Sequence, residues 1–390
     1  MRTLFTAIAI LSVASTFAQQ KDSTTTQQDA IYNRPFILAN KATALGGYVE
    51  GNTNYWSEDG ISEGFSQELR RFNIFTFAQI HPKIQFLSEL EFEHGTEEIA
   101  IETAQLDFNF NPALNFRAGI VLPALGLVNT NHDSPNWEFV ERPLSSTNLI
   151  PTTLSEVGFG FFGKFFPSTQ SIISYNVYLV NGLQDGVILN GEGRTHLESG
   201  KSEEAFGEDN NGSPAANIRV SFAHRKVGEI GFSTYLGTYN TPALEGAEID
   251  ERRRLGIFAC DFQFNIQQLT VQGEGVMVSV QVPEDVTDLY ASHQHGGFVD
   301  FIYPVVKGSI FGFKKSILNL AARLEYNDYY ANAGPSNGED DIKGMSLGLG
   351  WRPKSGTIVR ANYIRRSAQD LLGNPAAQIG GFQIGVASYF

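Results

Sequence analysis

Three glutamates occupy every second position in one segment of the chain: Glu89, Glu91 and Glu93. Side chains at this spacing point to the same face of an extended strand. Three carboxylates on one face create a negative field that attracts cations and repels anions. The spacing therefore indicates a strand face that steers ions by its charge.

Other charged residues are predicted to share the polar faces of strands with these glutamates. A lipid-facing Arg or Lys would cost about 2–4 kcal/mol at the midplane of a bilayer, so we expect such groups to face a water-filled interior. The further acidic residues are Glu156 and Glu325, and the basic ones are Arg117, Lys164, Arg219, Arg323 and Arg360. The mixture of signs favours weak selectivity, and solvation of a wet interior without selectivity is the alternative.

The segment 127–153 combines charged residues with large apolar ones. Its charged residues are Asp133, Glu138 and Glu141 against Arg142 alone, and Trp137 is the largest of its apolar residues. A freely solvated loop seldom carries so many large apolar groups. We interpret it as a loop folded inward that narrows a pore, with a cation-leaning balance; an external loop packed on a neighbouring subunit is the alternative.

Residues that could support catalysis or metal binding form no recognisable set. None of the seven histidines is paired by spacing with an activated serine, so we predict no enzyme. His293 and His295 could share one strand face, but no third ligand is evident, and we predict neither a metal nor a cofactor. The formal net charge of −14 argues against nucleic acid as a partner.

The elements that must position these residues are strands with one apolar and one polar face. In 84–93, Phe86, Leu90 and Phe92 oppose the glutamates, and the last segment alternates up to Phe390. Sixteen such strands are expected, at about 42–55, 66–79, 83–94, 98–110, 115–126, 154–166, 171–182, 215–225, 228–240, 253–265, 268–281, 296–307, 316–329, 343–352, 357–366 and 379–390. Short turns and long loops alternate between them, as in outer-membrane barrels. We predict an all-β fold: a transmembrane antiparallel β-barrel with an inward-folded loop after strand five.

The first residues indicate export. Met1-Arg2, the apolar stretch that follows and the small residues before Gln19 are typical of a secretory signal peptide, assigned to 1–18. We assign 19–40 to a periplasmic leader, with 19–30 expected to be disordered, and 41–390 to the barrel. Within strand two, Phe75 and Phe77 fall on the face opposite Phe72, which indicates either a bulge or an inner face packed against another segment.

The central part of the chain resembles a known family. Arg117-Ala118-Gly119, Glu141-Arg142-Pro143, Ile150-Pro151-Thr152-Thr153 and Gly158-Phe159-Gly160-Phe161-Phe162-Gly163 are similar to the central block of the phosphate-selective porin O and P family of Gram-negative outer membranes. The resemblance implies a sixteen-stranded, usually trimeric channel with an inward loop after strand five. It also implies that Phe390 belongs to the signal read by the barrel-assembly machinery. Family phosphate selectivity depends on Arg and Lys in the constriction, and the acidic 127–153 segment departs from that pattern.

Taken together, the sequence predicts a porin of the cell outer membrane that allows passive, weakly selective diffusion of small hydrophilic solutes or inorganic ions. The alternatives are an anion- or phosphate-selective channel and a structural or adhesive barrel with a plugged lumen. The expected partners are the solutes, outer-membrane lipid and lipopolysaccharide, the barrel-assembly machinery and further copies of the chain in a homotrimer.

Overall fold

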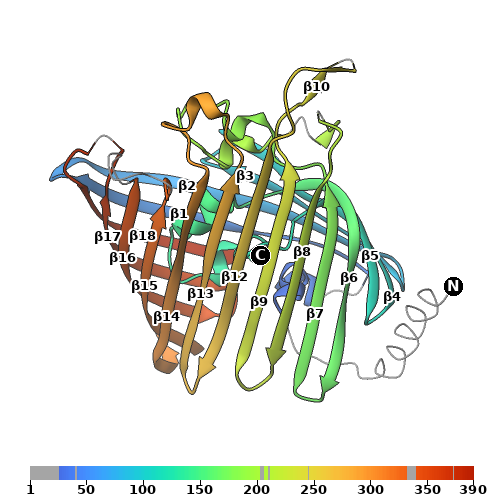
Figure 1. Cartoon of the computed structure of the whole chain (residues 1–390). Helices are drawn as coiled ribbons and strands as arrows, with labels where there is room; N and C mark the ends of the chain where they lie inside the picture. Colours follow the sequence, from blue (N-terminus) through green and yellow to red (C-terminus); the bar gives the residue numbers. More distant parts are fainter. Residues whose placement is uncertain are drawn as a thin grey trace.

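The chain forms a closed barrel of sixteen antiparallel strands (Figure 1). A computed structural model describes residues 26–39, 42–202, 206–209, 211–244, 246–331, 340–371 and 373–390. The barrel strands are β1 (Thr43–Glu58), β2 (Ile61–His81), β3 (Ile84–Glu93), β4 (Glu98–Asn111), β5 (Leu114–Val121), β6 (Glu156–Ser168), β7 (Ser171–Val180), β8 (Ala215–His224), β9 (Gly228–Thr238), β12 (Arg254–Ile266), β13 (Leu269–Val280), β14 (His293–Ile310), β15 (Phe313–Asp328), β16 (Asp341–Lys354), β17 (Thr357–Ala368) and β18 (Ala377–Tyr389). The barrel closes where β1 pairs with β18, with Tyr48 opposite Tyr389. The predicted all-β barrel and its strand number are confirmed.

The period of two in the sequence determines which side chains face the interior. In β18, Gln383 is buried, whereas its neighbours Phe382 and Ile384 are exposed on the outer face. In β3, Glu89 and Glu91 are buried on the inner face. Because closure pairs every strand on both sides, the wall leaves no sheet edge, as required of a barrel in hydrocarbon.

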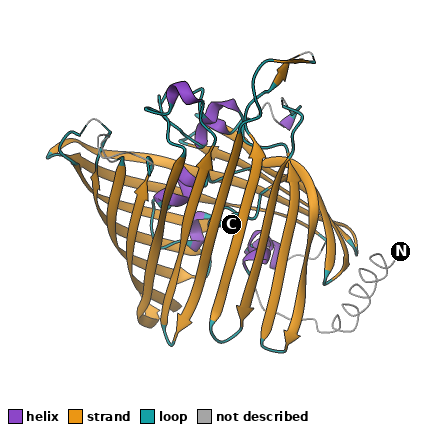
Figure 2. Cartoon of the chain, in the orientation of Figure 1, coloured by secondary structure: helices purple, strands orange, loops and turns teal. Residues whose placement is uncertain are grey.

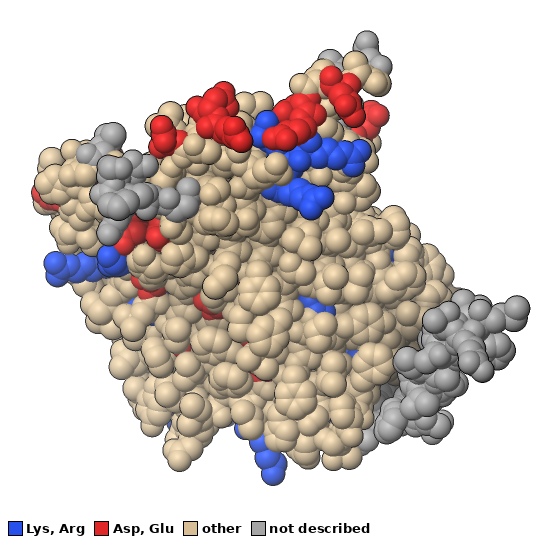
Figure 3. Space-filling model, in the orientation of Figure 1, with Lys and Arg blue, Asp and Glu red and all other residues tan. Residues whose placement is uncertain are grey.

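Long and short connections lie at opposite ends of the barrel, as predicted. The long segments 122–155, 181–214, 239–253, 281–292, 329–340 and 369–376 follow the odd-numbered members of the sixteen, and we call their side the external end. One of them carries the small hairpin of β10 (Ala243–Leu244) and β11 (Ala247–Glu248), which the sequence did not predict. Charged side chains gather at this rim, whereas the wall below it shows few (Figure 3).

Of the two alternatives for β2, a bulge or an inner face packed against another segment, the structure shows the packed inner face. The pairing of β2 with β3 runs without a shift from Arg71 to Gln79. Phe75 and Phe77 therefore face the interior, where the Phe75 ring stacks on Phe36 with ring centroids 5.5 Å apart. The inner face of β2 is apolar because a segment from the N-terminal part of the chain covers it.

That segment is 26–39, which contains the 3-10 helix η1 (Gln27–Tyr32) and the short helix α2 (Pro35–Ala39). Short helices, purple in Figure 2, are also present in the long connections, including η2 (Ser134–Asn136) and the π-helix η3 (Ser145–Leu149). The expectation of disorder over 19–30 is wrong for 26–30, because the wall supplies partners for this stretch. The predicted signal peptide lies outside the described residues. No helix among the described residues is long and apolar enough to cross a membrane.

Candidate functional site

The segment 122–155, between β5 and β6, is hydrogen-bonded to the inner wall. The Ala124 amide donates to Asn217 Oδ1 on β8 at 2.8 Å, and the Leu127 amide donates to Glu274 Oε2 on β13 at 2.8 Å. Gly126 between them has a positive φ of 63°, and a Cβ there would lie 2.5 Å from the Glu274 carboxylate. Only glycine fits this approach of the backbone to the wall.

The second half of the segment contacts a strand near the C-terminus of the chain. The Val140 amide donates to Asn362 Oδ1 on β17 at 2.9 Å. Arg360 Nη1, also on β17, donates to the carbonyls of Ser134 and Trp137 at 3.1 and 2.7 Å. Contacts with β8, β13 and β17 require the segment to cross the interior of the barrel.

The segment 26–39 occupies a second part of the interior, towards the end with short turns. The Gln27 amide donates to Glu229 Oε2 on β9 at 2.9 Å. The Tyr32 hydroxyl donates to Asp107 Oδ2 on β4 at 2.7 Å. Polar wall groups therefore hold a short piece of chain that has little helical stability of its own.

Arg34 joins the two inner segments to the wall. Its guanidinium lies 2.7 Å from Glu89 on β3 and 2.8 Å from Asp133 of the 122–155 segment, and its Cζ lies 3.6 Å from the centre of the Phe75 ring. His132 Nε2 lies 3.2 Å from the other Glu89 oxygen. Burial lowers the pKa of His132, but the adjacent Glu89 carboxylate outweighs it and raises that pKa to about 9.

The predicted acidic wall residues all face the interior, but most are paired. Glu89 pairs with Arg34, Glu93 with Arg71, and Glu325 with Arg366 at 3.0 Å. Of these five predicted residues, two have no ion pair among the described residues: Glu156 accepts from the Tyr235 hydroxyl, and Glu91 from the Asn73 amide.

The predicted basic wall residues are paired as well. The ion pairs are Arg117 with Asp107, Lys164 with Asp29, Arg219 with Asp261, Arg323 with Asp300, and Arg360 with Glu50. Neighbouring opposite charges cancel at a distance, so these pairs act on solutes through local hydrogen bonds more than through a net field.

The predicted constriction residues belong to the 122–155 segment, and the three acidic ones, Asp133, Glu138 and Glu141, are also paired. Glu138 Oε1 lies 2.8 Å from Arg352 Nε, and Glu141 Oε1 lies 2.8 Å from Arg70 Nη1. Burial raises the pKa of Glu141, but the Arg70 guanidinium more than reverses this and lowers it to about 2. Trp137 is buried, and its indole N–H donates to the Asn131 carbonyl at 2.7 Å. Arg142 donates one N–H to the Thr152 carbonyl.

Sequence reasoning missed the partners of these residues. Strand alternation carries a signal for the wall partners, since each lies on the polar face of its strand: Glu50, Arg71, Asp107, Asp261 and Asp300. Asp29 and Arg34 had no such signal, because they lie in a polar stretch without periodicity.

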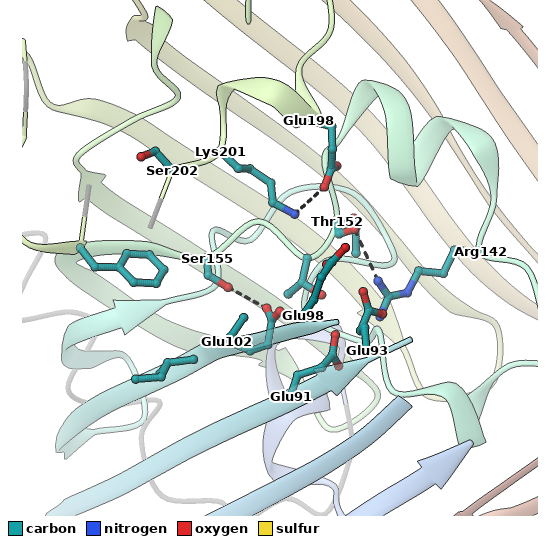
Figure 4. A pocket seen from close by; sticks show the side chains of 14 residues that line it. Glu91, Glu93, Glu98, Glu102, Arg142, Thr152, Ser155, Glu198, Lys201 and Ser202 are labelled. Atoms are coloured by element: carbon teal, nitrogen blue, oxygen red, sulfur yellow. Dashed lines mark hydrogen bonds and ion pairs between the residues drawn. The ribbon is translucent and has the colours of Figure 1, made fainter. Parts of the chain in front are cut away.

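Cavities remain at both ends of this filled interior. One of about 320 Å³ lies at the external end, between β3, β4 and the long connections, and five glutamates line it together with Arg142 and Lys201 (Figure 4). Two others, of about 290 and 400 Å³, adjoin the segment 26–39. The lining of the first two is mainly polar, which suits hydrated solutes.

Comparison with known proteins identifies similar folds. No family model matches the chain. An uncharacterized protein of Aquifex aeolicus (strain VF5) is 25% identical over 362 residues, which cover 86% of this chain and 78% of that protein.

The fold is similar to solved outer-membrane proteins at low sequence identity. The outer membrane channel DcaP of Acinetobacter baumannii superposes with a TM-score of 0.56 at 12% identity, over 89% of this chain and 97% of that one. An anion-selective porin from Comamonas acidovorans gives 0.54 at 11%, over 90% and 99%. OmpF of Salmonella typhi, in complex with daunomycin, gives 0.57 at 11%, over 89% and 97%. These identities establish a shared fold alone.

Proposed function

We propose that this chain is an outer-membrane porin that allows passive diffusion of small hydrophilic solutes or ions. The observation that carries the proposal is a closed barrel with an apolar outer face and a charged interior. The similarity to the named channel and porins supports it. The segments 122–155 and 26–39 fill much of the lumen, so we expect a narrow path and a small conductance, with 122–155 as the constriction.

Single-channel recording in planar lipid bilayers tests this function. The mature protein should produce discrete conductance steps at either polarity of the applied voltage. Heat-denatured protein from the same preparation is the control. A folded barrel that inserts without any steps would contradict the proposal and favour the plugged structural barrel instead. The specific support for that alternative is the burial and pairing of interior charges such as Arg360, which is 1% exposed.

For selectivity we propose a weak cation preference or none. Glu138 and Glu141 hold Arg352 and Arg70 in ion pairs. Replacing both glutamates by Gln should leave these arginines uncompensated and shift the reversal potential in a salt gradient towards anions. An anion preference already present in the native protein would instead support the anion- or phosphate-selective alternative and a closer relation to the phosphate-selective porin O and P family.

The proposed partners are lipid, lipopolysaccharide, the assembly machinery and two further copies in a homotrimer. Arg252 and Arg254 are exposed at the external rim beside a groove of about 790 Å³, and their side chains have no ion-pair partner among the described residues. Such a site suits lipid phosphates. Phe390 is 59% exposed and stacks on Phe72, which leaves the terminal ring accessible to the assembly machinery. A trimeric form of OmpT of Vibrio cholerae, which has a similar fold at 13% identity, supports the trimer.

A further inference from the structure

Two buried carboxylates line the external cavity without a direct ion pair, and Arg142 lines the same cavity. Glu91 and Glu102 are 3% and 8% exposed, and neither has an Arg, Lys or His within ion-pair distance among the described residues. Ser155 Oγ donates to one oxygen of Glu102 at 2.8 Å, and no described group donates to the other. Most other interior carboxylates have a basic partner. An uncompensated buried carboxylate is costly, so this site is suited to a cation from solution.

The same cavity contains further acceptors that the protein leaves unused. Thr152 and Thr153 are each 5% exposed, and their hydroxyl oxygens have no hydrogen-bond partner among the described atoms. Glu98 lines the cavity as an exposed carboxylate without a described partner. Figure 4 shows Glu98, Glu102 and Thr152 around one space, while Lys201 is turned to Glu198, 2.7 Å away. Buried polar groups normally have partners, so the vacant hydroxyls, which can accept as well as donate, indicate a polar ligand. Nε and Nη2 of Arg142 in the same lining are also vacant, which leaves room for an acceptor on that ligand.

These acceptors do not converge on a single metal ion. Among the described residues, Glu89, His132 and Asp133 alone place three candidate ligand atoms within 4.8 Å of one another, and Arg34 already neutralises that group. An ammonium group, in contrast, carries three donors that can reach acceptors in different directions. The cavity, at about 320 Å³, accommodates a small organic molecule.

We propose that the cavity lined by Glu91, Glu98, Glu102, Thr152 and Thr153 binds small organic amines at the external mouth of the barrel. The amine would place its ammonium group between the carboxylates, and the threonine hydroxyls would accept hydrogen bonds from its remaining N–H groups. The amine site rests on the proposed channel function for its biological role, because it would concentrate cationic solutes at the entrance.

Isothermal titration calorimetry of the detergent-solubilised full chain with 1,4-diaminobutane tests the site. The native protein should bind the diamine, and Glu98→Gln with Glu102→Gln should weaken binding by about tenfold or more, because the ammonium group loses charge-assisted hydrogen bonds to two carboxylates. Glu97→Gln is the matched control, because Glu97 is an exposed neighbour that does not line the cavity. It should bind like the native protein.

Three outcomes would overturn the amine site. They are absence of heat with the native protein, equal binding by the native and doubly substituted proteins, and displacement of the diamine by an equal concentration of Mg²⁺. If the double variant fails to fold, Glu98→Gln alone keeps the test valid, because that side chain is exposed. Calorimetry does not require conduction. Missing conductance steps would therefore refute the channel while leaving the amine site standing.

Discussion

At the scale of single residues, Arg34 stabilises the interior of the barrel because it neutralises two buried carboxylates. Removing one partner of a buried ion pair costs about 3–5 kcal/mol. Arg34→Met should therefore loosen the segment 26–39 and speed its amide hydrogen exchange by roughly 100-fold, at about tenfold per 1.4 kcal/mol. Hydrogen exchange followed by mass spectrometry measures this change. Arg252→Met, at an exposed arginine, should leave the exchange unchanged, and an equal effect of both variants would contradict the assigned role.

The neighbouring His132 predicts a dependence on pH. Its pKa in the folded protein, about 9, exceeds the unfolded value of about 6.5, so the charged imidazolium stabilises the folded state. This contribution, on the order of 3 kcal/mol, is fully present below about pH 6.5 and is lost as the pH rises through about 9. The free energy of unfolding should fall across this interval. In His132→Gln the fall should be absent, and persistence of the native slope would assign the titration to another group.

Single residues also show where sequence reasoning ends. Glu89 was identified as an interior charge because alternation is a local property of a strand. Its partner Arg34 lies 55 residues away in a stretch without periodicity, and the ion pair of Arg360 with Glu50 spans 310 residues. Which charges meet across a lumen depends on strand register and on the course of inner segments, and no local pattern encodes either.

At the scale of elements, the strands were predictable and the inner segments were less so. Strand alternation and loop lengths gave all sixteen barrel strands, but β5 ends at Val121, before the expected 126. The chain leaves the wall there because Leu122 packs inward against the cluster around Phe75 and Phe77. The segment 26–39 was expected in part to be a disordered leader. Its order comes from contacts with the wall, which no local pattern in its sequence indicates.

The position of 26–39 predicts the effect of its deletion. The first barrel strand begins at Thr43, so removing 27–39 should leave the wall intact while it vacates part of the lumen. The single-channel conductance should rise. Removal of the external hairpin 243–248 is the control, because β10 and β11 pair with each other outside the barrel sheet. Unchanged conductance after the first deletion, in protein that still shows the native strand content by circular dichroism, would place the limiting constriction elsewhere.

At the scale of the whole molecule, stability depends on an apolar outer face in contact with lipid. Ile384, in the middle of β18, is 58% exposed on that face, whereas Ile61 lies at the external end of β2. Arg at the bilayer midplane costs about 2–4 kcal/mol, and Arg near the interface about 0–1 kcal/mol. Ile384→Arg should therefore lower the free energy of unfolding much more than Ile61→Arg. Urea titration of protein refolded into phospholipid vesicles measures both values.

The contrast between these two substitutions tests the membrane assignment itself, because both add the same charge to an exposed isoleucine. In a barrel surrounded by water the two sites would be equivalent, and an exposed arginine would change stability by less than about 0.5 kcal/mol at either. A dependence on depth arises only if hydrocarbon surrounds the middle of the wall. Equal effects at Ile384 and Ile61 would indicate that hydrocarbon does not surround the middle of the wall. This result would contradict the proposed path for solutes across a membrane.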